Sequence, residues 1–260
     1  MAQRVALLLQ YLGSDFCGWQ RQLNGISVQQ TIEEAIALHA GHAVTIHGAG
    51  RTDTGVHASA QVAHFNTTSP IPSDRWAKIL TASLPKSIAI LQSVAVADTW
   101  HAQFSAIWRR YRYVIYTGQQ PNVFWRQFCW HYYYAPLDED LMRQALLPML
   151  GEHDLSALQR AGSKRRHARL TMQEVACWRE GDLLIVEVQA SGFLYGMIRL
   201  LMGLLVQVGR SQMSLQEFAD IWQNQRRHLV KYAAPPQGLC LIGVGYPQNP
   251  FTVKTRSFWG

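Results

Sequence analysis

The sequence predicts an α+β fold of two similar β-α-β-β-α-β-like halves, joined in a mainly antiparallel sheet with helices on one face. Nearly half of the 260 residues are apolar and 11% are aromatic, which is enough to build a sizeable core. Segments with strand and helix periodicity come in the same order twice along the chain. The strands outnumber what two parallel crossovers would use, and hairpin signals favour antiparallel pairing.

The first half is expected to cover residues 1–100. It begins with a buried strand at 5–11, followed by a helix that Ser27 caps, with Gln30 at the capping-box position, and that ends at Gly41. The remaining elements expected here are a short strand at 43–48, a strand at 60–65, a helix at 73–84 that ends before Pro85, and a strand at 88–95.

The second half is expected to cover residues 101–260 and to resemble the first in its order of elements. Its predicted elements are a long strand at 104–117, a helix at 137–150, a hairpin of strands at 171–180 and 182–191, helices at 195–209 and 214–223, and a last strand at 239–246. The boundary falls near residues 97–103. Because no low-complexity linker separates the halves, we expect a basic cleft between them that can hold a site.

The composition points to an anionic partner. Twenty-four Lys and Arg against 17 Asp and Glu give a net charge of +7, although charged residues are only 16% of the chain. Clustered Lys and Arg gain affinity for nucleic acid by neutralising phosphates and releasing counterions, so nucleic acid is the favoured partner. The alternative is a basic protein that its charge keeps in solution.

The sequence indicates a cytoplasmic protein without a membrane segment. The four cysteines form no CxxC pair, which favours free thiols in a reducing compartment. The N-terminus lacks a small-residue cleavage site, so no signal peptide is expected. The longest apolar segment, residues 193–208, is interrupted by Arg199 and is shorter than the roughly 20 residues that a membrane span needs.

Residues 48–58, GAGRTDTGVHA, form a polar, glycine-rich segment with an aspartate close to an arginine. A phosphate cradle is disfavoured, because the segment lacks the third glycine of the dinucleotide fingerprint and the Gly-Lys-Ser/Thr of a P-loop. The Asp-Thr-Gly of aspartic proteases would need a second copy for its dyad, and Arg51 opposes proton sharing. The third interpretation is a single ionised Asp53 that acts as a nucleophile on a tight loop open to a bulky substrate.

An ionised Asp53 in a site that excludes water needs a nearby cation, and Arg199 is a candidate. It is the one formal charge between residues 193 and 209, in a helix that is otherwise apolar almost all round. An unpaired buried guanidinium is costly, so we expect a carboxylate to meet it. The alternative is that Arg199 pairs with an ordinary acid such as Glu187 or extends to the surface.

Two further segments carry basic side chains suited to binding RNA. In WRRYRYVIY, residues 108–116, alternation places Arg109, Tyr111 and Tyr113 on one face and Arg110 and Arg112 on the other, so basic side chains and rings are interleaved. The three arginines are candidate phosphate contacts. The run at 161–171 is too polar for a core, and its candidate phosphate contacts are Lys164, Arg165, Arg166 and Arg169. The alternatives are core tyrosines with surface arginines in the first segment and a solvated turn in the second.

Together these segments resemble the TruA-type tRNA pseudouridine synthases, almost from end to end. YLGSDFCGWQRQ is similar to the family's opening motif, GAGRTDTGVHA to its catalytic loop, RRYRY to its stacking-tyrosine segment and GFLYGMIR to its arginine segment. GEHDLSAL and APPQGL also look like family segments. Thr54, Leu155, Leu158 and Tyr195 depart from the family pattern, and these departures bear on local packing and tRNA preference rather than on the chemistry.

The resemblance implies an isomerase that converts uridine to pseudouridine at positions 38, 39 and 40 of the anticodon stem-loop of tRNA, as a homodimer and without a cofactor. It implies that Asp53 is the nucleophile, that Arg51 enters the RNA helix, that Tyr111 stacks on the uracil and that Arg199 pairs with Asp53. No metal is expected, because the histidines lack a metal-ligand spacing. The alternative function is a noncatalytic RNA-binding protein.

Overall fold

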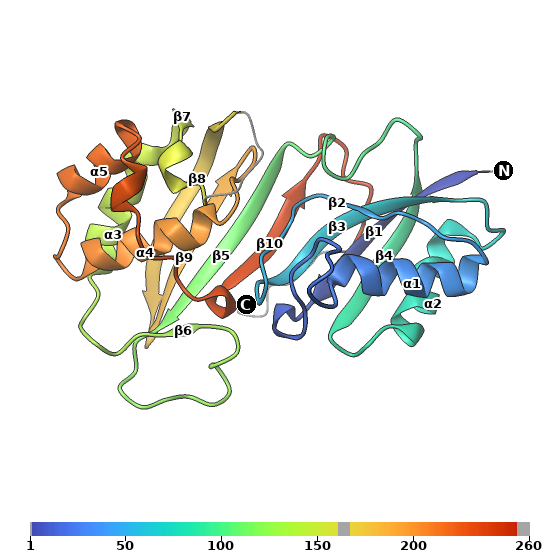
Figure 1. Cartoon of the computed structure of the whole chain (residues 1–260), viewed down its shortest axis with the longest axis horizontal. Helices are drawn as coiled ribbons and strands as arrows, with labels where there is room; N and C mark the ends of the chain where they lie inside the picture. Colours follow the sequence, from blue (N-terminus) through green and yellow to red (C-terminus); the bar gives the residue numbers. More distant parts are fainter. Residues whose placement is uncertain (1, 161–166, 254–260) are drawn as a thin grey trace. The chain divides into compact units, whose positions relative to one another are not determined.

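The structure is a computed structural model that describes residues 2–160 and 167–253. Strands and helices are interspersed along the chain, which makes the protein α+β as predicted (Figure 1). In chain order the elements are β1 (Gln3–Tyr11), α1 (Val28–Ala40), β2 (His47–Gly48), β3 (His57–Thr67), α2 (Trp76–Ser83), β4 (Ile88–Val96), β5 (Trp108–Tyr116), β6 (Trp130–His131), α3 (Glu139–Leu146), β7 (Gly151–Asp154), β8 (Arg169–Glu180), β9 (Leu183–Ala190), α4 (Met197–Gly209), α5 (Leu215–Gln223) and β10 (Leu239–Gly245).

Pairing between the strands is mainly antiparallel. β1 runs antiparallel to β3 and β4, β2 to β3, β7 to β8 and β8 to β9, whereas β5 and β6 pair in parallel. This agrees with the expected α+β class, because antiparallel strands need only short connections such as the β8–β9 hairpin at Gly181.

The described residues divide into two compact units, one containing residues up to Arg109 and from Leu241 onward, and the other containing Arg110–Cys240. The sequence places a boundary near residues 97–103 and assigns the last strand to the second half. In the structure residues 241–253 pack in the first unit, because Tyr246 and Phe251 are buried in its core. The local sequence pattern does not reveal which unit a segment near the chain end packs against, so this difference could not be predicted.

The first unit follows the predicted order of elements, β-α-β-β-α-β. Its hydrogen-bonded strands lie in the order β4-β1-β3-β10, with β2 paired to β3. In β1, Val5, Leu7 and Leu9 are fully buried on one face, as the buried-strand pattern predicts. The strand expected at 43–48 pairs only over His47–Gly48.

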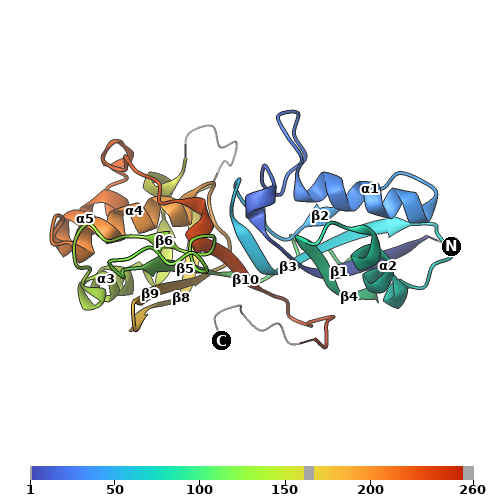
Figure 2. The same ribbon diagram turned by 90° about the horizontal axis from the view of Figure 1, so that it is seen from below.

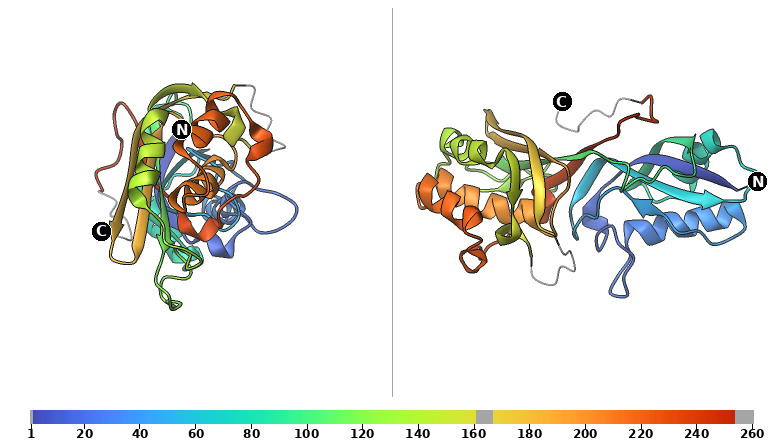
Figure 3. Two further views of the ribbon diagram at one scale, coloured as in Figure 1. Left: turned by 90° about the vertical axis from the view of Figure 1, so that its left-hand side faces the viewer. Right: turned by 90° about the horizontal axis from the view of Figure 1, so that it is seen from above.

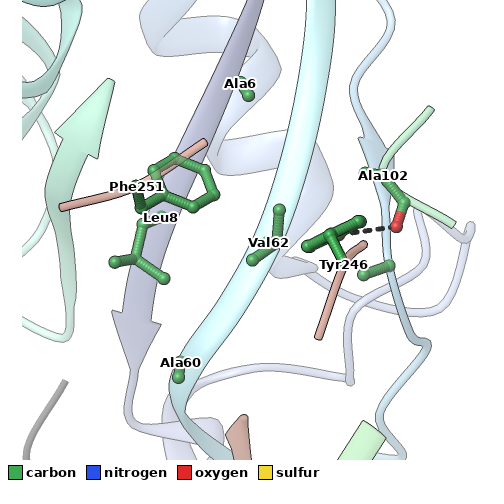
Figure 4. Close-up of a cluster of buried hydrophobic side chains, with 8 residues drawn as sticks. Ala6, Leu8, Ala60, Val62, Ala102, Tyr246 and Phe251 are labelled. Carbon is green, nitrogen blue, oxygen red and sulfur yellow. Dashed lines mark hydrogen bonds between the residues drawn. The ribbon is translucent and has the colours of Figure 1, made fainter. Parts of the chain in front are cut away.

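Both faces of this sheet carry buried apolar side chains. On one face Phe65 of β3 packs edge to face against Trp76 of α2, with ring centroids 5.3 Å apart. On the other face Leu8 and Val62 form a cluster with Tyr246 and Phe251 from the segment after β10 (Figure 4). Figure 2 shows that segment and α1 on opposite sides of the strands. The first unit is therefore a sheet covered on both sides.

The second unit contains the strand order β5-β9-β8-β7, with β6 paired to β5. Along the chain, a strand, a helix, a hairpin and a helix repeat the order of the first unit, with β6 and β7 as short strands that the sequence pattern does not predict. Helices α3, α4 and α5 pack against one another and α3 packs against β8; Figure 3 shows them beside the β8–β9 hairpin. All four residues of β7 pair with β8, but the strand is short and polar, so its sequence carries little strand signal.

Helix ends follow the expected local chemistry. The Ser27 side chain accepts a hydrogen bond from the Gln30 amide, and Gly41 ends α1 in the left-handed region at φ 75°. The Gln30 side chain donates to Glu34 instead of closing the capping box. No helix within the described residues has the length and apolar character to cross a membrane.

Candidate active site

The glycine-rich loop connects β2 to β3 and forms a tight turn at Asp53. The Val56 amide donates to the Asp53 carbonyl at 3.1 Å, and Gly55 has φ 79°. A four-residue turn with a positive φ at its third residue strongly favours glycine there. Asp53 therefore occupies the first position of the turn, where its side chain is half-buried while Arg51 and Thr54 are exposed.

Thr52 anchors the loop from within the first unit. Its hydroxyl shares a hydrogen bond of 2.8 Å with the Tyr11 hydroxyl at the end of β1. Its carbonyl accepts from the Trp19 amide at 3.0 Å. All three residues are buried, so these bonds are shielded from water and hold the residue next to Asp53 in one place.

The arm of the loop that precedes Asp53 is fixed from β3. Ala49 donates its amide to the Val62 carbonyl at 2.7 Å, and the Gln61 side chain donates to the Gly50 carbonyl at 2.7 Å. Gln61 is fully buried. A fully buried glutamine side chain needs a specific hydrogen-bond partner, and the Gly50 carbonyl provides it here.

The segment that precedes α1 lies directly against the loop. A Cβ atom added to Gly18 would lie 2.7 Å from the Thr52 carbonyl oxygen, and one added to Gly13 would lie 2.0 Å from that of Val56. Gly18 also has φ 91°. These contacts explain why the opening motif YLGSDFCGWQ has glycine at both positions, because only glycine lets the two backbones approach this closely.

Arg109 is buried, with 8% of its surface exposed, and its guanidinium binds main-chain carbonyls of the first unit. Nε and Nη2 donate to the Ala49 carbonyl at 3.1 and 3.0 Å, and Nη1 donates to that of Ala106 at 3.2 Å. Nη2 also donates to the Gln103 carbonyl. The sequence names Arg109 as a phosphate contact, but this burial does not support that role.

Arg110 and Arg112 lie on the opposite face of β5 from Arg109, as the alternation predicts. Arg110 pairs with Glu174 and also donates to Gln189 at 3.0 Å. Arg112 pairs with Glu187 at 2.7 Å, and both of these side chains are largely buried. Glu187, the alternative partner considered for Arg199, is thus engaged by Arg112.

Tyr111 is buried within the second unit. Its ring packs edge to face against Phe193, with centroids 5.0 Å apart and planes at 86°. Phe193 belongs to the segment GFLYGMIR that leads into α4. The motifs RRYRY and GFLYGMIR, which are about 80 residues apart in the chain, are therefore in contact.

Arg199 lies in the first turns of α4 and is half-buried, whereas its neighbours Ile198 and Leu200 are buried. Its Nε donates to the Ala234 carbonyl at 2.7 Å, and the Ala234 amide donates to the Arg199 carbonyl at 2.8 Å. Tyr113 donates its hydroxyl to the neighbouring Pro235 carbonyl at 2.8 Å. Burial raises the pKa of Tyr113, and the positive charge of Arg199 partly opposes this rise. The APPQGL segment is thus held between α4 and β5.

The basic run is only partly described. Lys164, Arg165 and Arg166 lie outside the described residues. Arg169 begins β8 and is exposed, with Nη1 3.5 Å from a carboxylate oxygen of the equally exposed Glu152. A pair so exposed contributes little to stability, which leaves the Arg169 guanidinium available to another anion.

Comparison with known proteins decides the family. Residues 8–105 and 145–247 match the family model described as tRNA pseudouridine synthase. The chain belongs to the tRNA pseudouridine synthase family. It is 59% identical over 250 residues to tRNA pseudouridine synthase A of Nostoc sp. (strain PCC 7120), covering 96% of this chain and 89% of that protein. The corresponding protein of Thermosynechococcus vestitus is 58% identical over 249 residues, covering 96% and 88%.

Membership of this family makes the chain an isomerase and confirms the resemblance found in the sequence. For a tRNA pseudouridine synthase the structure adds the contacts of three residues with the loop that carries Asp53: Tyr11 and Gly18, which lie in the opening motif, and Gln61, which lies outside the motifs. Each is separated from the loop in sequence or hidden in a strand, so no local spacing connects it with Asp53.

The histidines of this family member form a cluster that the sequence does not predict. His47, His64 and His101 have ring centroids 4.5 to 5.5 Å apart. Nδ1 of His64 accepts from the Ala102 amide at 3.2 Å. Among the residues that the structure describes, no group of three His, Cys, Asp or Glu side chains has a geometry suited to a metal ion.

Proposed function

We propose that this chain isomerises uridine to pseudouridine at positions 38, 39 and 40 of the anticodon stem-loop of tRNA. Family membership supports tRNA pseudouridine synthesis, and the TruA-type motifs support these positions. The observation that carries the proposal is the loop at Asp53. Buried bonds from Tyr11, Trp19 and Gln61 fix its backbone, while Arg51 and Thr54 face solvent and Asp53 is half-buried.

The reaction is an exchange of one bond for another within the nucleoside. The bond from N1 of uracil to C1′ of ribose breaks, the uracil turns, and C5 joins C1′. The C5 proton is then lost and N1 gains one, so no atom is added overall. A nucleophile or base on a rigid loop suits this chemistry, because the approach to the sugar or base is set before the substrate binds.

We assign the roles as the resemblance implies. Asp53 acts as the nucleophile on the sugar or the base, or takes the 2′ proton as the base departs. Tyr111 stacks on the uracil and assists removal of the C5 proton, and Arg199 keeps Asp53 ionised and oriented. Arg51 enters the RNA helix and helps to displace the target nucleotide, whose extrusion costs a few kcal/mol in unstacking.

Substrate binding is expected to depend on shape and phosphate contacts, since several neighbouring uridines must be accepted. Arg169 is exposed and bound only weakly to Glu152, which makes it the best described candidate. For Arg110 and Arg112, contact with phosphate would compete with their pairs to Glu174 and Glu187. Lys164, Arg165 and Arg166 stay candidates from the sequence.

Tritium release from tRNA labelled at C5 of uridine tests the reaction. The protein should release tritium, and Asp53→Asn should abolish release while tRNA binding persists. Asp74→Asn is the control, because Asp74 is an exposed carboxylate of the first unit that lies in a short helical turn before α2 and not in the loop of Asp53. Binding of tRNA by the parent without tritium release would overturn the proposal in favour of a noncatalytic RNA-binding protein.

Mapping pseudouridines in tRNA from cells that lack this protein tests the positions. We expect uridine in place of pseudouridine at 38, 39 and 40, and unchanged modification elsewhere. We further propose that the enzyme acts in the cytoplasm as a homodimer, as the TruA-type resemblance implies. Sedimentation equilibrium at micromolar concentration should give twice the mass of the 29.5 kDa chain; a monomer with full activity would contradict the dimer.

A further inference from the structure

Arg109 connects the loop of Asp53 to a turn far away in sequence. Two of its nitrogens donate to the carbonyl of Ala49, four residues before Asp53. The same guanidinium donates to the carbonyls of Gln103 and Ala106. One side chain therefore bridges segments about 50 residues apart, all within the first unit.

The turn at the other end of this bridge is itself firmly held. The Ala102 amide donates to Nδ1 of His64 at 3.2 Å, and the Tyr246 hydroxyl donates to the Ala102 carbonyl at 2.7 Å (Figure 4). Ala102 is fully buried, and Tyr246 belongs to the cluster that covers β1 and β3. The turn is thus a fixed point to which Arg109 can attach the loop.

The chemistry of this bridge requires arginine. A guanidinium presents five N–H donors in a planar fork and can serve several carbonyls at once. A lysine ammonium has donors on one atom only and cannot span Ala49 and Ala106 in the same way. The charge is also buried, and its cost is offset only while these donors keep their acceptors.

We propose that Arg109 is a positioning residue for the loop of Asp53 in the isomerisation, and not a phosphate contact. This rests on the proposed role of Asp53. Loss of the fork releases the Ala49 carbonyl, so the loop samples positions from which Asp53 does not meet the nucleoside. Affinity for tRNA is unaffected, because Arg109 does not face solvent.

The test is Arg109→Lys in single-turnover tritium release at saturating enzyme, with tRNA affinity measured separately. We expect the rate to fall about tenfold or more, the scale of a small misplacement of a catalytic group, with tRNA Kd and its salt dependence unchanged. A phosphate contact predicts the reverse: a weaker Kd, a salt slope smaller by about 0.7 to 0.9, and an unchanged rate at saturation. That result would overturn the proposal.

Arg179→Lys is the matched control for the loss of a guanidinium fork. Arg179 binds Glu139 and the Leu137 carbonyl in the second unit, remote in the chain from the loop of Asp53. It should lower Tm without changing the single-turnover rate. Equal rate losses in both variants would mean that Arg109 matters only for stability and would overturn its positioning role.

Tyr246→Phe keeps the test decisive if Arg109→Lys does not fold. It removes only the hydroxyl bond to the Ala102 carbonyl and so loosens the fixed point that Arg109 uses. We expect the single-turnover rate to fall less than in Arg109→Lys, with the Kd for tRNA unchanged. An unchanged rate would count against the proposal. If the parent itself releases no tritium, the proposed function fails and not the inference about Arg109.

Discussion

The hydroxyls of Tyr11 and Thr52 lie 2.8 Å apart and share a buried hydrogen bond. Tyr11 ends β1, and Thr52 precedes Asp53 in the loop between β2 and β3. The last residue of the central strand thus sets the position of the residue beside the proposed nucleophile. β1 therefore supports the loop of Asp53 directly.

Tyr11→Phe should weaken both stability and catalysis. It leaves the buried Thr52 hydroxyl without this partner, a loss of about 1 to 2 kcal/mol in the free energy of unfolding. Tritium release should fall as well, because Thr52 and Asp53 are adjacent. Urea unfolding and release rates measure the two effects. Tyr133→Phe is the control: this tyrosine is exposed, so neither quantity should change appreciably. Wild-type release by Tyr11→Phe would show that the bond does not position the loop.

Gly18→Ala should impair activity much more than Gly41→Ala. Both glycines have positive φ, so each substitution strains the backbone by about 1 kcal/mol. Only at Gly18 does the added Cβ meet the loop, 2.7 Å from the Thr52 carbonyl oxygen; at Gly41 nothing lies within 4 Å. The comparison of Tm and tritium release in the two variants separates strain from displacement of the loop. Similar activity in both would contradict the close contact.

Arg199→Met should impair turnover far more than tRNA affinity. Methionine preserves much of the apolar packing along α4 but removes the charge that we assign to the orientation of Asp53, and it also loses the bond to the Ala234 carbonyl. Single-turnover rates and tRNA Kd values provide the comparison. Equal losses in rate and affinity would argue that Arg199 serves in binding or in folding.

The free energy of unfolding should decrease in mild acid because of His64. Burial, followed by the charges of His101, His47 and Arg4, lowers the pKa of His64 from 6.5 to about 3. Between these values the unfolded state binds a proton that the native state does not, so stability is complete above pH 6.5 and falls as the pH decreases toward 3. One such group contributes a slope of up to about 1.4 kcal/mol per pH unit.

His64→Asn tests this origin of the pH dependence. The asparagine side-chain oxygen can still accept from the Ala102 amide but does not titrate. Urea unfolding at several pH values from 7 to 4.5 should show a shallower slope for the variant. His101, whose pKa burial also lowers, retains part of the dependence in both proteins. Parallel curves for parent and variant would exclude His64 as the cause.

Local chemistry explains why most elements were predictable. The apolar residues of β1 predict a buried strand, and Ser27 and Gly41 predict the two ends of α1. The strand expected at 43–48 shrinks to His47–Gly48 because pairing partners, which the sequence does not reveal, decide where a strand begins. β6 and β7 are missed for the same reason: short strands exist only through their neighbours.

The sequence by itself determined the α+β class, the order of elements in the first half, the loop of Asp53 and the family, since each rests on residues close together in the chain. Only the tertiary structure decided that Arg109 is buried against Ala49 and that residues 241–253 belong to the first unit. The physical reason is the same in both cases. A guanidinium or a terminal segment gains free energy from partners 60 or more residues away, and neither composition nor periodicity encodes that distance.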